Sequence, residues 1–227
     1  MTRLLQLGLA TLAAVAAALV AGVAPSGAAS AGNSVTYQDS TGEDPASLDV
    51  QQIVVSNDDA GLVTFEIHLG NAAAFGGKNA VTIFIDTTSN ANDGAGPAFM
   101  GAELLLVVSD NAVDLGRWDG SKFDFSGGSP SSLTYSFSGG VMTVRVNAND
   151  IGLTSFNFLV VTVSDYSSDN PAVDLAPDSG HGAYAYQVKI SPPVTTTAPH
   201  VVTTAAKAKT PKCKKGHKST KAHKCHR

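Results

Sequence analysis

The chain has 227 residues, enough for one domain of ordinary size with tails. Its two cysteines both lie near the C-terminus, which excludes thiol catalysis in the body of the chain. The net charge of −4 conceals an uneven distribution, because all 19 acidic residues lie between Asp39 and Asp178 and residues 207–227 hold nine basic residues and no acid. The body therefore carries a charge of −14, which favours solubility and suits a Ca²⁺-rich exterior, and the tail carries +9.

The N-terminus has the pattern of a secretory signal peptide. Arg3 is followed by an almost continuously apolar run, Leu4–Ala24, and then by small residues. We predict that residues 1–31 are the signal peptide, with cleavage after Ala31 and Ala29 as the alternative. The apolar run is also long enough to span a bilayer, so an uncleaved anchor is the other interpretation. No other segment is this long, and we expect a secreted, extracellular or cell-surface protein with no transmembrane segment after cleavage.

Residues 32–190 have the pattern of short strands separated by turns. Val63–Leu69 alternates between apolar and polar residues with the period of two expected of a half-buried strand, and the turn Asn57–Gly61 precedes it. Phe156–Val163 is almost continuously apolar, which predicts a central strand buried on both faces. The other predicted strands are 34–37, 48–56, 81–85, 102–108, 111–118, 123–125, 133–137, 141–146 and 184–190, with at most one helical turn in 147–153.

About ten strands at spacings of roughly 8 to 12 residues, with no amphipathic helix, predict an all-β fold. We expect two packed antiparallel sheets, a β-sandwich binding domain over residues 32–190. The composition changes after this domain. Residues 191–206 are rich in Thr and Pro and lack the apolar residues needed to order themselves, which predicts a disordered linker.

The segment between the strands 81–85 and 102–108 is the first candidate for a metal site. It supplies hard oxygen ligands of the kind that Ca²⁺ prefers, from Asp86, Asn90, Asn92 and Asp93. Its glycines let the chain fold back so that carbonyl oxygens can converge. The spacing is not that of an EF-hand. Asn, Asp and Gly also serve exposed loops that bind nothing, and this second interpretation stays open.

Residues 207–227 form a basic tail that contains both cysteines and several histidines. In an exported protein Cys213 and Cys225 predict one disulfide that closes a small basic loop, and a metal site formed with the neighbouring histidines is the alternative. Such a loop fits anionic cell-envelope polymers, and a solvated tail without a partner is an equal alternative. No aromatic residue lies among the lysines, so specific nucleic-acid recognition is not expected.

Catalytic arrangements are not evident. The chain has no Gly-x-Ser-x-Gly turn and no phosphate-binding glycine loop, so we expect no enzyme activity. Trp118 is a candidate sugar platform next to Arg117, although a lone Trp at a strand end also serves to cover the core. His181 is a candidate at a ligand edge or an ordinary loop histidine.

A set of short pieces in the body forms a further pattern. The pieces are Leu48-Asp49-Val50, Val54-Val55-Ser56-Asn57-Asp58, Phe84-Ile85-Asp86-Thr87 with Asn90, Gly101-Ala102-Glu103, Arg117-Trp118-Asp119-Gly120-Ser121 and Asp174-Leu175-Ala176-Pro177-Asp178. Together they resemble exported bacterial domains of the DOMON-like and family 9 carbohydrate-binding-module type, over about Val35 to Ile190. The resemblance implies a jelly-roll β-sandwich that binds without catalysis, with Ca²⁺ in the carbohydrate-binding members and no organic cofactor expected here.

The resemblance makes Asp86 and Asn90 the first metal candidates, and it adds as weaker ones Asp39, Asp44, Asp174 and Asp178. The chain also departs from this family pattern. The sugar-binding members clamp a sugar between two aromatic rings, whereas this chain has one Trp, and the haem ligands of related DOMON domains have no matched positions here.

We therefore expect a secreted, non-catalytic module, stabilised by Ca²⁺, that binds carbohydrate or an anionic cell-envelope polymer. A structural surface protein with no small ligand is the first alternative, and a secreted hydrolase is the second.

Overall fold

The computed structural model describes residues 34–42 and 46–190. The predicted signal peptide, the Thr/Pro-rich linker and the tail with Cys213 and Cys225 lie outside the described residues, as does Asp44. Within the described part, no helix is long and apolar enough to cross a membrane.

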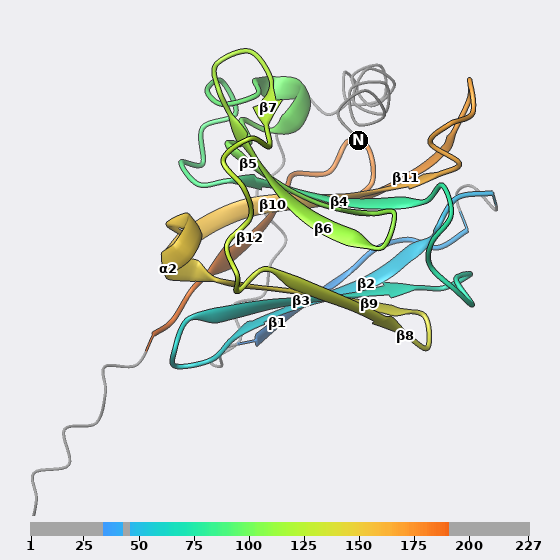
Figure 1. The fold of residues 1–227 in the computed structure, drawn as a ribbon, viewed down its shortest axis with the longest axis horizontal. Coiled ribbons are helices and arrows are strands. Elements are labelled where there is room, and N and C mark those ends of the chain that lie inside the picture. The colour runs from blue at the N-terminus through green and yellow to red at the C-terminus, as the bar shows by residue number, and fades with distance from the viewer. Residues whose placement is uncertain (1–33, 43–45, 191–227) are drawn as a thin grey trace, which may run out of the picture. The chain divides into compact units, whose positions relative to one another are not determined.

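The described residues form two antiparallel sheets that pack face to face as two layers (Figure 1). The first sheet has five strands in the order β1-β2-β3-β9-β8. Its strands are β1 (Ser34–Gln38), β2 (Val50–Asn57), β3 (Leu62–Leu69), β8 (Thr134–Ser138) and β9 (Val141–Asn147). The prediction of an all-β, two-sheet sandwich is confirmed.

The second sheet has seven strands, in the order β11-β10-β4-β5-β6-β7, with β12 also paired to β10. Its strands are β4 (Ala80–Asp86), β5 (Leu104–Ser109), β6 (Ala112–Trp118), β7 (Phe123–Asp124), β10 (Ser155–Ser164), β11 (Ala172–Ala176) and β12 (Tyr184–Gln187). Two short helices lie between strands, η1 (Pro97–Phe99) and α2 (Ala148–Ile151).

The core lies between the two sheets and follows from the alternation of side chains along each strand. Val63, Phe65 and Ile67 of β3 are fully buried, and the residues between them are only half-buried. The Phe65 ring contacts the rings of Phe156 and Phe158 from β10, with centroids 5.9 and 5.6 Å away. These aromatic contacts pack the two sheets against each other.

A second apolar cluster lies on the outer side of the seven-stranded sheet. Phe84 of β4 and Leu159 of β10 belong to it, although their neighbours in each strand point into the core. Phe99 of η1 stacks on Phe84 with the ring centroids 5.0 Å apart, so the β4–β5 loop covers part of this face. The prediction that 156–163 forms a central strand buried on both faces is confirmed.

Some element boundaries differ from the predictions. β11 was not predicted as a strand, because its alternation is broken by Asp174, whose side chain points toward the other sheet and accepts from the Val50 N–H at 2.7 Å. The expected strand 123–125 is only two residues long, and the strand expected over 184–190 ends at Gln187. The predicted helical turn is α2, which Asn147 caps by accepting from the Asn149 N–H.

Candidate functional site

The candidate site lies where β4 and β5 enter the loop that joins them. In this antiparallel pair Ile85 lies opposite Leu104. The next position outward on each side is Asp86 and Glu103, so these two residues lie opposite each other. The Glu103 N–H donates to the Ile85 carbonyl at 3.0 Å, which extends the ladder to this point.

The loop folds back over this end of the hairpin because two glycines allow a close backbone approach. Gly101 has φ +81°, and a Cβ there would lie 2.2 Å from the Asn90 carbonyl oxygen. Gly94 has φ +44°, and a Cβ there would lie 2.2 Å from the carbonyl oxygen of Gly101. A larger residue does not fit at either position. The fold-back places Asp93 above the strand ends.

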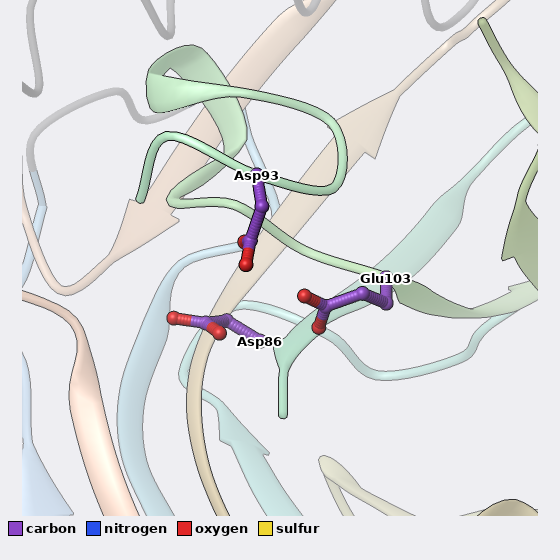
Figure 2. A group of neighbouring side chains, drawn as sticks. All are labelled: Asp86, Asp93 and Glu103. Carbon is purple, nitrogen blue, oxygen red and sulfur yellow. The ribbon is translucent and has the colours of Figure 1, made fainter. Parts of the chain in front are cut away.

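Three carboxylates converge at this point, from Asp86, Asp93 and Glu103 (Figure 2). One oxygen from each lies within 4.8 Å of the others. Asp86 is buried at 1% exposure, and the other two side chains are half-buried. We call this group the acidic triad, and it can hold a metal ion.

Hydrogen bonds from the loop fix the orientation of the triad. Asp86 Oδ1 accepts from the backbone N–H groups of Ser89 at 2.7 Å and Thr88 at 2.9 Å. Glu103 Oε2 accepts from the N–H of Thr87 at 2.7 Å and from its hydroxyl at 3.0 Å. These hydrogen bonds hold the Asp86 and Glu103 carboxylates in place beside the ends of β4 and β5.

The Thr88 hydroxyl lies among the three carboxylates. Its Oγ1 is 2.9 Å from Asp93 Oδ2, 3.2 Å from Asp86 Oδ1 and 3.2 Å from Glu103 Oε1. A hydroxyl has one proton to donate, so it satisfies only one of these oxygens at a time. Thr88 therefore cannot satisfy all three carboxylates at the same time.

No base of the described residues forms an ion pair with the triad. Within the described residues the one ion pair joins Lys78 and Asp165, away from the triad. Two carboxylates about 4.8 Å apart repel by about 3.5 kcal/mol at an effective dielectric constant near 20. In addition, the buried Asp93 Oδ1 has no hydrogen-bond partner. A cation bound here would supply both a compensating charge and a contact for this oxygen.

The structure brings together only some of the residues predicted for the metal site. Asp86 and Asp93 belong to the triad. Asn90 lies beside it, because its Nδ2 donates to Asp93 Oδ2 at 3.2 Å and its Oδ1 accepts from the Asn92 N–H at 3.2 Å. Asn92 is exposed. Glu103 was missed as a ligand, although pairing the two apolar runs as a hairpin places it opposite Asp86.

Three of the weaker metal candidates form a separate acidic group. Asp39 follows β1, Asp174 lies in β11 and Asp178 follows β11. Burial, and then the charges of Asp178 and Asp174, raise the pKa of the Asp39 carboxyl to about 8. The Tyr184 hydroxyl donates to Asp39 Oδ1 at 3.3 Å, and the Ser40 hydroxyl donates to Asp178. Within the described residues, only the acidic triad meets the distance requirement for a metal cluster.

The predicted ligand-binding residues do not form one site. Arg117 and Trp118 are consecutive in β6, so their side chains point to opposite faces. The Trp118 ring contacts the Phe123 ring edge-on with the centroids 5.3 Å apart, and it packs against the outer apolar cluster. His181 is exposed in the β11–β12 loop, where its N–H donates to the Asp178 carbonyl at 3.1 Å.

Comparisons of the chain with protein-family models, with curated proteins and with solved structures found no match. The fold and the site therefore define the class on their own. The described part is a two-sheet antiparallel β-sandwich with an acidic triad that can hold a metal ion.

Proposed function

We propose that the protein is an exported, non-catalytic binding module in which Ca²⁺ occupies the acidic triad and fixes the β4–β5 loop. The observation that carries this proposal is the convergence of Asp86, Asp93 and Glu103, none of which forms an ion pair with a base in the described part of the chain. The resemblance to carbohydrate-binding and DOMON-like domains, with its jelly-roll topology, is part of the proposal.

The chemistry of the triad favours Ca²⁺ over softer metals. All of the candidate ligand atoms are oxygens, and hard cations prefer oxygen whereas Zn²⁺ and Cu ions favour nitrogen and sulfur. Ca²⁺ takes about six to eight ligands in flexible geometry, which a loop can supply from carboxylates, carbonyls and water. The triad would hold the ion, and the ion would neutralise the repulsion among the three side chains.

The ligand class in this proposal is carbohydrate or cell-envelope polymer. Export, through the predicted signal peptide, places the domain where such polymers are found. The basic tail adds an electrostatic contact to anionic polymers, which weakens steeply with salt. Holding a polymer also requires no catalytic group, in keeping with the absence of a nucleophile motif from the sequence.

The test is a binding screen of the secreted protein with and without Ca²⁺. Calorimetric titration with Ca²⁺ measures the metal site directly, and a glycan array that includes neutral and anionic envelope polymers measures the ligand. Saturable Ca²⁺ binding together with retention of at least one polymer supports the proposal. If no polymer is retained under either condition, the module binds none of them and the proposal is wrong.

The second candidate is a structural surface protein with no small ligand. One observation favours it: Trp118 packs against Phe123, and no aromatic side chain in the described part is fully exposed. A sugar platform of the stacking kind is therefore not built on the described surface. A structural role predicts Ca²⁺ binding with no retention of any polymer.

A further inference from the structure

The five-stranded sheet has one face in the core and one open to solvent. Alternation along the strands places fifteen residues of the open face in three rows, which follow from the register of the strand pairs. The rows are Ser34, Ser56, Thr64, Arg145 and Thr134; Thr36, Val54, Glu66, Thr143 and Ser136; and Gln38, Gln52, His68, Val141 and Ser138. We call this surface the open face.

The open face is chemically unlike the rest of the body. Ten of its fifteen residues carry a hydroxyl or a side-chain amide, and its charged residues are Glu66 and Arg145. It therefore holds only one of the chain's 19 acidic residues. This face is close to neutral in a body that is strongly acidic.

The hydroxyl and amide groups of the open face have no side-chain hydrogen-bond partner among the described residues. None of the ten makes a side-chain hydrogen bond to another residue of the described part, as Thr64 and Thr143 at its centre illustrate. In the loops the opposite holds: Ser121 donates to Asp119 at 2.8 Å, and Ser126 donates to Asp124 at 2.7 Å. The loop hydroxyls shape the backbone, whereas those of the open face are available to a ligand.

The other outer face of the sandwich differs. It is apolar, and loop residues such as Phe99 and Phe125 pack against it. The open face is thus the large polar sheet surface that the described residues leave uncovered.

This chemistry fits an uncharged sugar polymer. Each sugar hydroxyl both donates and accepts, as do the side chains of the open face. A single Arg gives little attraction for a phosphate or carboxylate polymer, and the absence of aromatic rings removes stacking on bases. Strands about 4.8 Å apart, with side chains about 6.8 Å apart along each strand, give a donor or acceptor at every few ångströms in both directions.

The twist of the sheet limits the form of that polymer. Neighbouring strands rotate by about 20 to 25°, so five strands turn the face by about 90° from edge to edge. A flat crystalline surface cannot follow this turn, but a single flexible chain can. We propose that the open face binds a single chain of an uncharged polysaccharide through its free hydroxyl and amide groups. This inference rests on the proposed function as a polymer-binding module.

Affinity electrophoresis of the secreted protein in gels that contain soluble β-glucan, mannan or polygalacturonate tests the inference. A concentration of about 0.5 M NaCl suppresses binding through the basic tail. The double variant Thr64→Val/Thr143→Val removes two central hydroxyls and keeps the size and the β-branching of both side chains. Thr154→Val, at an exposed threonine outside the five-stranded sheet, is the matched control.

We expect the wild type and Thr154→Val to be retarded by a neutral glycan, and the double variant to bind it about tenfold more weakly with an unchanged melting temperature. Equal retardation of wild type and double variant by a neutral glycan overturns the inference and leaves the proposed function standing. Binding only to polygalacturonate, lost in salt, also overturns it and assigns the polymer contact to the tail. Binding to no polymer in any condition overturns both the inference and the proposed function.

Discussion

Replacing Asp93 by Asn tests the acidic triad, because the effect on stability should have opposite signs with and without Ca²⁺. Without the ion, the change removes one of three mutually repelling charges. Each close pair costs about 3.5 kcal/mol at an effective dielectric constant near 20, but solvent reaches the half-buried Asp93 and Glu103 and screens much of this. We expect Asp93→Asn to raise the free energy of unfolding in EDTA by about 1 kcal/mol.

With Ca²⁺ the wild type should be more stable than Asp93→Asn. Extracellular modules bind Ca²⁺ with dissociation constants near 0.1 to 1 mM, so 10 mM Ca²⁺ should stabilise the wild type by about 1.4 kcal/mol at the weaker end of this range. For a domain of this size that free energy raises the melting temperature by about 3 to 5 °C. Asp93→Asn loses a charged ligand and should show little or no such shift.

Differential scanning calorimetry in EDTA and in 10 mM Ca²⁺ measures both effects. Asp59→Asn, at an exposed residue of the β2–β3 turn, is the matched control because it changes the net charge equally and lies outside the triad. An identical wild-type melting temperature in both buffers, or a full Ca²⁺ shift in Asp93→Asn, would refute the assignment of the triad as the metal site.

The remaining predictions concern pH, loop geometry and the independence of the two surfaces. Because the Asp39 pKa is raised to about 8, above about 3.9 in the unfolded chain, the folded state holds the extra proton between these values, and stability should fall as pH rises through this window. With the screening expected at a half-buried site, the free energy of unfolding should fall by about 2 kcal/mol between pH 5 and 8.5, as measured by urea titration. Asp39→Asn should make this fall smaller. If the pH dependence of the variant equals that of the wild type, Asp39 is not its origin. Gly101→Ala should abolish the Ca²⁺ shift in melting temperature, because the added Cβ meets the Asn90 carbonyl. Gly120→Ala is the control and should keep the shift, because the space around Gly120 is open. Equal behaviour of the two variants would count against the loop geometry. Ca²⁺ and neutral glycan should bind independently, since the triad and the open face belong to different sheets, so a glycan dissociation constant that changes with Ca²⁺ would argue for a shared site.

The sequence predicted best those elements whose pattern is local. β3 alternates cleanly and follows a strong turn, so its residues and its buried face could be assigned from spacing alone. β11 could not, because Asp174 occupies an inward position in it and its partner, the Val50 N–H, is distant in sequence. A buried carboxylate that satisfies a backbone donor of the other sheet leaves no mark in local hydropathy.

The candidate site was half predicted for the same reason. Asp86 and Asp93 lie in one polar segment, and the composition of that segment pointed to hard oxygen ligands. Glu103 lies between η1 and β5, directly before the strand, and only the register of β4 and β5 brings it to Asp86. Asn90 and Asn92, which composition ranked equally with the acids, are used in the turn, where the Asn90 side chain accepts from the Asn92 N–H. Composition identifies a loop rich in ligand atoms, and pairing decides which of them converge.

The difference between the outer faces of the two sheets follows from the same alternation of side chains that builds the core. In the seven-stranded sheet the outward positions are also apolar, so loops must cover them, and the loop that covers Phe84 with Phe99 is the one that carries Asp93. A cation that fixed this loop would therefore protect an apolar surface from water as well as relieve the repulsion within the triad. In the five-stranded sheet most of the outward positions carry hydroxyls or amides, which need no cover. The open face is therefore the extended polar sheet surface of the described part, and it is the surface on which we propose that the polymer binds.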